Sequence, residues 1–223
     1  RKDSSYLLMY GLSDWYDLGP NRPGFCQLTP MGLTATAYYY NDLQLMNKMA
    51  LLLNKQADAK RYALWADSVK QAFNKMYFHK LAKQYGSGSQ TSNAIAISFG
   101  LVNEKDKSAV LQNIIKDIEQ HSYALTCGDI GFHHLLKVLS AAGRNDIIFK
   151  MNNRTDVPGY GYQLAKGATA LTESWQGLPI VSNNHFMLGH LMDWFYTGLA
   201  GIQQAGNSVA YKSIVIKPQP VGD

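Results

Sequence analysis

The fold is decided by a stretch near the end of the chain, Asn183-Asn184-His185-Phe186-Met187-Leu188-Gly189-His190-Leu191-Met192-Asp193-Trp194-Phe195-Tyr196. Drawn as a helix over about 183–204, this stretch is apolar around nearly its whole circumference, and Leu199 and Ile202 continue the pattern. A helix without a polar face is expected to be buried on every side. The sequence therefore predicts an inner helix that is surrounded by other parts of the fold.

Most of the remaining chain shows the apolar spacing of helices that are buried on one face. Helices are expected at about 29–54, 57–77, 91–101, 105–121, 131–142 and 145–151. Thr29 is the expected N-cap of the first, with Pro30 at its first helical position, and Gly143 is placed to end the fifth. Inner helices alternating with half-buried ones indicate two concentric layers, as in an all-α (α/α)6 toroid of helical hairpins.

Three segments do not fit helices. Residues 79–89 are predicted to form a loop, and residues 152–182 are irregular and rich in glycine and aromatic residues. Residues 210–216 alternate like a strand, and a single strand is not stable without partners. We therefore expect residues 1–204 to be part of the toroid, and residues 205–223 to begin a C-terminal β domain, a β-sandwich that lies outside this chain.

Composition excludes several classes of function. The net charge is only +5 and no dense basic run is present, which argues against nucleic-acid binding. No apolar run reaches the length of a membrane span. Cys26 and Cys127 have no metal-ligand spacing, so neither a metal nor a cofactor is expected. The sequence assigns no oligomeric state and no compartment, and it is compatible with a periplasmic or extracellular location.

The residues suited to chemistry lie in the glycine-rich segment. Glu173 stands two residues before Trp175, and a carboxylate beside an aromatic wall is what a glycosidase needs to activate water next to a sugar. His185 is expected to open the last helix, where the helix dipole favours a neutral imidazole that could bond a sugar hydroxyl. Plainer alternatives stay open. Glu173 could be an acidic residue near a helix start that Thr172 caps, and Trp175 and His185 could be core residues.

Motifs along the whole chain resemble one family. Gly167-Ala168-Thr169 through Glu173 to Trp175, followed by Asn184-His185 and Gly189, resembles the paired motifs of glycoside hydrolase family 78, the α-L-rhamnosidases. The same resemblance extends to Gly11-Leu12-Ser13-Asp14-Trp15, Gly88-Ser89-Gln90-Thr91, Gly128-Asp129-Ile130-Gly131-Phe132, Gly143-Arg144, Trp194-Phe195-Tyr196, Gly201-Ile202 and the run from Tyr211 to Pro218. The motifs follow in order and cover nearly the whole chain.

The resemblance implies a six-hairpin toroid that removes terminal α-L-rhamnose with inversion. It implies that Glu173 is the general base, that Trp175 and His185 line the sugar pocket, and that Asp14 and Trp15 lie at its mouth. For Asp14 the plainer alternative is that its carboxylate caps backbone N–H groups in a turn. The family's general acid lies in an acidic segment that these residues do not contain, so it is expected outside the fragment. The run Ala170-Leu171-Thr172 before Glu173 is less bulky than is usual in the family.

Two other functions remain open from sequence. A polysaccharide lyase of the helical-toroid type would use a tyrosine, Tyr160 or Tyr162, with His185 to abstract a proton beside a uronate, but only Lys166 is near in sequence to neutralise the acid. Alternatively, the chain is a partial toroid that binds glycan without cleaving it. The fragment alone is expected to be inactive.

Overall fold

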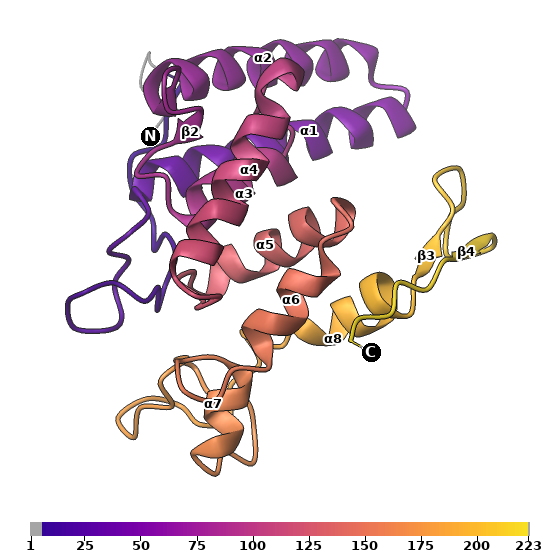
Figure 1. The fold of residues 1–223 in the computed structure, drawn as a ribbon. Helices are drawn as coiled ribbons and strands as arrows, with labels where there is room; N and C mark the ends of the chain where they lie inside the picture. Colours follow the sequence, from indigo (N-terminus) through magenta and orange to yellow (C-terminus); the bar gives the residue numbers. More distant parts are fainter. Residues whose placement is uncertain (1–5, 223) are drawn as a thin grey trace.

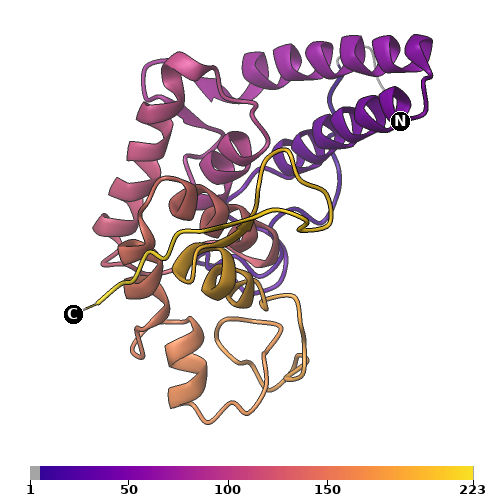
Figure 2. The same cartoon turned by 90° about the vertical axis from the view of Figure 1, so that its right-hand side faces the viewer.

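The computed structural model describes residues 6–222 and begins with a long helical hairpin. Helix α1 (Met31–Leu52) and helix α2 (Gln56–Tyr77) lie side by side at one end of the molecule (Figures 1 and 2). Helix α1 begins after Pro30 without a side-chain cap, so the N-cap predicted at Thr29 is wrong. The Thr29 hydroxyl instead lies 2.9 Å from the hydroxyl of Ser89.

A short antiparallel pair, β1 (Phe78–His79) and β2 (Gln84–Tyr85), replaces the loop that was expected after α2. Helices α3 (Gln90–Ser98), α4 (Glu104–Gln120), α5 (Asp129–Ala141) and α6 (Asn145–Asn152) follow close to their predicted bounds. Every residue of α3 from Gln90 to Ala96 is buried, because α3 packs against α1, α4 and α5. The predicted all-α fold is confirmed.

Two clusters of buried apolar side chains form the core. One lies under α1, α2 and α3 and contains Leu33, Phe73 and Ile95; the other surrounds α5 and contains Phe132 and Trp175. Each such side chain contributes about 1.5–3 kcal/mol when it is removed from water. The second cluster joins the glycine-rich segment to α5. Trp175 of that segment is part of the cluster, and Tyr160, the first residue of the short helix α7 (Tyr160–Ala165), packs against it.

The prediction of a long, fully buried helix over 183–204 is wrong. Residues 183–190 form turns, and only α8 (Leu191–Trp194) and the π-helical turn η1 (Phe195–Leu199) are helical. The backbone N–H of His185 donates to the carbonyl of Leu171, and that of Gly189 donates to the carbonyl of Phe186 in a turn. Leu191 and Trp194 are buried, whereas the side chains on the other face, Met192, Phe195 and Tyr196, are exposed.

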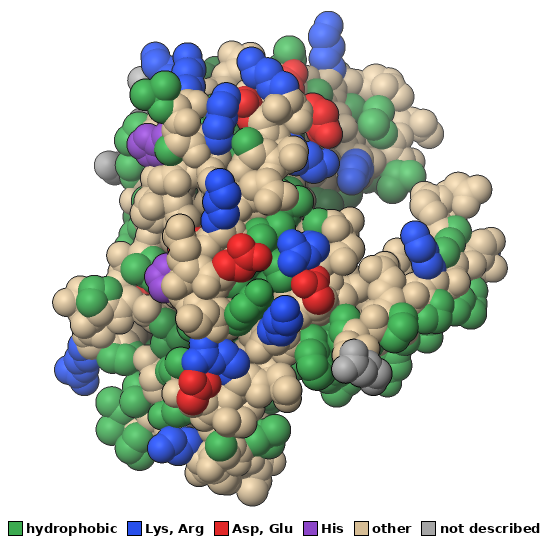
Figure 3. All heavy atoms as spheres, viewed as in Figure 1, with side chains coloured by type: hydrophobic (Ala, Val, Ile, Leu, Met, Phe, Trp, Pro, Cys, Tyr) green, Lys and Arg blue, Asp and Glu red, His purple; other side chains and the backbone are tan. Residues whose placement is uncertain are grey.

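The C-terminal strand has a partner within the chain. Strand β4 (Ile214–Ile216) pairs antiparallel with β3 (Ile202–Gln204), so the expectation that the chain supplies no partner is wrong. Gly201, at a φ of +68°, allows the chain to leave η1 and enter β3. Both strands are exposed, and Figure 3 shows apolar side chains gathered along this hairpin. Among the described residues no helix is both long and apolar enough to cross a membrane.

Candidate active site

The loop that carries Asp14 is tied to the start of α5. The Asp14 carboxyl group accepts hydrogen bonds from the backbone N–H groups of Gly128 (2.9 Å) and Gly131 (2.7 Å) and from the hydroxyl of Thr91. Burial raises the pKa of Asp14 to about 6, although these bonds act in the opposite direction. Asp14 is 0 % exposed, and its contacts fit the plainer alternative of an acid that caps backbone N–H groups.

A second buried acid shapes the same loop. Asp17 accepts hydrogen bonds from the backbone N–H groups of Gln27 and Leu28, while the N–H of Leu18 donates to the carbonyl of Thr126. The loop crosses α5 so closely that a Cβ atom on Gly128 would lie 2.1 Å from the carbonyl oxygen of Trp15. Asp14 and Asp17 therefore act as anchors that fix the two aromatic residues between them.

Those two aromatic residues are placed differently. Tyr16 is buried, whereas Trp15 is half-buried, with its ring edge-on to Tyr16 and to the exposed Phe25 at centroid distances of 5.6 and 5.0 Å. A partly exposed indole on a fixed loop offers a flat apolar surface of the kind that sugars stack on. Trp15 is thus the candidate wall residue with accessible surface.

Trp175 does not share this exposure. It is 0 % exposed, its indole N–H donates to the carbonyl of Cys127 at 2.9 Å, and its ring packs edge-on against Phe132 and Tyr160. Trp175 was predicted to wall the sugar pocket, and the structure places its indole N–H and its ring in the core. Its effect on the site is to hold the loop that carries Glu173.

Glu173 and His185 lie on one closed loop. The Glu173 N–H donates to the Ser182 carbonyl (2.9 Å) and the Ser182 N–H donates to Glu173 Oε2 (3.1 Å), while the His185 N–H donates to the Leu171 carbonyl (2.8 Å). Both side chains are half-buried. Residues 171–190, all of them described, contain no helix, so Glu173 is not a helix-start residue and the helix-dipole argument for His185 is wrong.

One acidic residue was not recognised from sequence as part of this site. Asp129 is the first residue of α5, its side chain is buried, and its Oδ1 has no hydrogen-bond partner among the described residues. Burial, then Asp14, then Glu173 raise the pKa of Asp129 to about 7. The charges of Glu173 and Asp129 also contribute to the raised pKa of Tyr16, after burial. The Trp175 indole N–H donates to the Cys127 carbonyl and the Asp129 N–H donates to the Trp15 carbonyl, so the glycine-rich segment and the Trp15 loop both contact the start of α5.

The residues that a lyase would use are arranged less well for that chemistry. Burial raises the pKa of Tyr160, which disfavours the phenolate that would abstract a proton. The ammonium of Lys166 lies over the ring of Tyr162, 5.3 Å from its centroid. Neither tyrosine has a described contact with His185.

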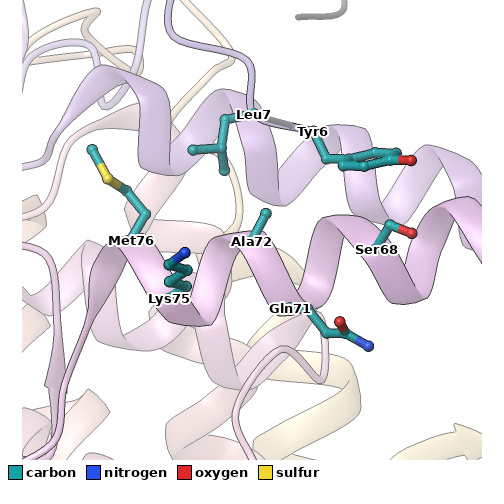
Figure 4. A pocket seen from close by; sticks show the side chains of 7 residues that line it. All are labelled: Tyr6, Leu7, Ser68, Gln71, Ala72, Lys75 and Met76. Carbon is teal, nitrogen blue, oxygen red and sulfur yellow. The ribbon is translucent and has the colours of Figure 1, made fainter. Parts of the chain in front are cut away.

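A separate groove lies away from these loops. It is a groove of about 610 Å³ between Tyr6 and Leu7 and the outer face of α2, where Gln71, Lys75 and Met76 line it (Figure 4). None of the five predicted site residues lines this groove. Within residues 6–222 no group of three or more His, Cys, Asp or Glu side chains is arranged to hold a metal ion.

Known proteins resemble the chain over almost its whole length. A family model described as the bacterial alpha-L-rhamnosidase 6 hairpin glycosidase domain matches residues 2–199. The alpha-L-rhamnosidase of Streptomyces avermitilis is 28% identical over 222 residues, which are 96% of this chain and 20% of that protein. An alpha-L-rhamnosidase of Formosa agariphila is also 28% identical, over 95% of this chain and 24% of its own length.

Solved structures agree. The alpha-L-rhamnosidase from Dictyoglumus thermophilum superposes with a TM-score of 0.87 at 34% identity, over 98% of this chain and 25% of that one. The Streptomyces avermitilis enzyme complexed with L-rhamnose gives a TM-score of 0.86 at 27% identity, over 98% of this chain and 21% of that one. The chain thus spans about a quarter or less of the length of these relatives.

Proposed function

Because the chain belongs to the bacterial α-L-rhamnosidase six-hairpin glycosidase family, we propose that it forms part of the catalytic domain of a glycoside hydrolase that removes terminal α-L-rhamnose. The observation that carries this proposal is the position of Glu173. Glu173 is half-buried on a loop that Ser182 closes, and this loop and the loop of Trp15 are both tied to the start of α5. A fixed carboxylate next to an aromatic surface suits hydrolysis of a sugar bond.

In this mechanism Glu173 is the general base. Its ionised carboxylate removes a proton from a water molecule that attacks the anomeric carbon, and the product has inverted configuration. An inverting enzyme needs a second, protonated carboxyl group roughly 6.5–9.5 Å away. We propose that this general acid lies outside the 223 residues, in the segment that the family places before the Trp15 loop.

The other predicted residues have separate tasks. The ring of Trp15 provides a stacking surface, and the imidazole of His185, on the same loop as Glu173, hydrogen-bonds a sugar hydroxyl. Asp14 and Trp175 hold the two loops from below without touching the sugar. Residues 1–204 belong to the toroid in this proposal, and residues 205–223 lead into the C-terminal β domain.

The test uses the full-length protein that carries this chain. Glu173→Gln keeps the size of the side chain and removes its basicity, and it is expected to lower turnover of an aryl α-L-rhamnoside by about 10²–10⁴-fold. Glu119→Gln, on the exposed face of α4, is the control and should leave turnover unchanged.

Two further readouts separate the alternatives. NMR of the first product should show β-L-rhamnose before mutarotation; α-L-rhamnose would refute inversion. A lyase would instead release an ultraviolet-absorbing unsaturated uronate and would be inactivated by Tyr160→Phe. Rhamnoside binding without turnover in the full-length protein would indicate a glycan-binding module.

A further inference from the structure

Three histidine side chains meet where the segment before α8 packs on α5. His133 and His134 are consecutive residues of α5, and His190 is the N-cap of α8. The ring of His133 lies 4.8 Å from that of His190 and 5.3 Å from that of His134, measured between ring centroids. His134 is buried, whereas His133 and His190 are half-buried. The three imidazoles therefore form one cluster between two elements of the fold.

His134 is the fixed, neutral member of this cluster. Its Nδ1 lies 2.9 Å from the hydroxyl of Ser98 on α3, and its Nε2 lies 3.2 Å from the hydroxyl of Tyr38 on α1. Both ring nitrogens thus have uncharged partners. Burial, then the neighbouring His133, lowers the pKa of His134 to about 3. Protons that enter the cluster near neutral pH are therefore taken up by His133 and His190.

The charged side chains that act on this pair are Lys137 from α5 and Asp193 from α8. Burial, then Lys137, lowers the pKa of His133, and burial, then His133, lowers that of His190. Asp193 acts in the opposite direction on both rings. One carboxylate can accompany one imidazolium ion, whereas two imidazolium ions at this separation repel each other. The pair is therefore suited to hold at most one proton.

The contact between the two rings is part of a larger docking surface. Leu188 and Leu191, on either side of His190, are buried in the apolar cluster around α5. The same segment carries His185. The contact of His133 with His190 adds to this apolar docking a part that can acquire charge, so the attachment of the segment depends on pH.

We propose that His133 and His190 are positioning residues that form a pH-sensitive latch, which holds residues 183–190 on α5 with at most one proton between the two rings and opens locally when both rings are protonated. Well above the ordinary histidine pKa of 6.5 both rings are neutral and the latch is closed. Below that value the open form binds two protons where the closed form binds at most one, so the latch weakens as the pH falls. Its consequence for sugar binding rests on the proposed role of His185.

Hydrogen–deuterium exchange of the full-length protein, measured by mass spectrometry on peptides that span residues 186–196, reports this local opening. After correction for intrinsic exchange rates, opening in the wild type should increase roughly 30-fold between pH 8 and pH 5, since the proton excluded from the closed pair corresponds to about 1.5 pH units below 6.5. His190→Gln and His133→Gln should each lose most of this increase. His79→Gln, at an exposed position of β1, is the control and should keep it.

An increase that is equal in the wild type and in either latch variant would overturn the proposal, and one folded variant is enough for this comparison. Both variants keep Asp14 and Asp129, so the titration of these buried acids cancels. Steady-state kinetics then test the link to the sugar site. As the pH falls from 8 to 5, KM for an aryl α-L-rhamnoside should rise in the wild type and rise less in His190→Gln. If exchange follows the latch while KM changes in parallel in the two proteins, His185 is not a sugar ligand and the latch stands.

Discussion

The carboxyl group of Asp14 accepts a hydrogen bond of 2.7 Å from the backbone N–H of Gly131, although 117 positions of sequence separate the two residues. The same group binds Gly128 and Thr91, so a single side chain joins the N-terminal loop, α3 and α5. The position of Trp15, and through it one side of the proposed sugar site, depends on this contact.

Asp14→Asn should therefore destabilise the fold. An amide has one acceptor oxygen where the carboxyl group has two, and its NH2 group would face a backbone N–H that needs an acceptor. We expect the free energy of unfolding to fall by about 2–4 kcal/mol, the range for leaving buried donors of a charged network unpaired. Urea denaturation measures this, with Asp67→Asn as the control. Unchanged stability combined with lost rhamnoside binding would restore the direct sugar contact that was first expected of Asp14.

Stability should decrease as the pH rises from about 4 to 8. Asp14 and Asp129 have folded pKa values of about 6 and about 7 against an ordinary value of 3.8. Between these values the folded state binds more protons than the unfolded state, so their contribution is complete at low pH and is lost as the pH rises through the folded values. For Asp129 the difference corresponds to roughly 4 kcal/mol at about 1.4 kcal/mol per pH unit.

Asp129→Asn isolates that contribution. The amide stays neutral, so the variant should gain stability relative to the wild type at pH 8, and the difference should shrink toward pH 5. Denaturation midpoints at these two pH values provide the measurement. A constant difference would mean that Asp129 titrates at its ordinary pKa in the folded protein.

The close approach of the loop to α5 predicts a strict need for glycine at position 128. A Cβ atom there would meet backbone atoms, Trp15 O at 2.1 Å and Asp17 N at 2.6 Å, and backbone cannot move aside as a flexible side chain does. Gly128→Ala should lower the free energy of unfolding by about 3 kcal/mol or more, by analogy with overpacking of a core. Gly206→Ala is the matched control, because nothing lies within 4 Å of the added atom. Equal melting temperatures for the two variants would contradict the described approach.

Sequence patterns were sufficient for the helices from α1 to α6, because each has an apolar face with helical spacing and most end near glycine or polar residues. They failed at the stretch that pointed most strongly to an inner helix. Its apolar composition was read correctly, but residues 183–190 form turns, and the His185 N–H donates to the distant Leu171 carbonyl, a tertiary contact that no local pattern shows. Met192, Phe195 and Tyr196 are exposed in this chain. The chain corresponds to only 25% of the Dictyoglumus thermophilum structure, so these side chains lack any contacts that the rest of such a protein would make.

For the candidate site, the family motifs located the correct loops without showing which side chains face outward. Asp14 and Asp17 flank an aromatic pair, and only the fold shows that the acids point inward to backbone N–H groups. Asp129 was visible only as part of Gly128-Asp129 at a helix start. Its pKa is raised by burial first and then by the charges of Asp14 and Glu173, both far away in sequence, so no local pattern shows it.

The two tryptophans of the site should respond in opposite ways to substitution, which tests whether Trp175 serves the core or the sugar site. Trp15 is half-buried, and its ring lies edge-on to the buried Tyr16 and to the exposed Phe25, so Trp15→Ala should leave the fold intact and raise KM for an aryl α-L-rhamnoside. A stacking contact of about 1 kcal/mol corresponds to a roughly fivefold change, and Trp15→Phe should recover part of it. Trp175 fills the core and bonds Cys127, so Trp175→Ala should cost about 3–5 kcal/mol of stability. Thermal unfolding and steady-state kinetics on the full-length protein separate these effects. A stable Trp175→Ala variant with a raised KM would return Trp175 to the wall of the sugar site, because a core residue cannot be removed without a loss of stability.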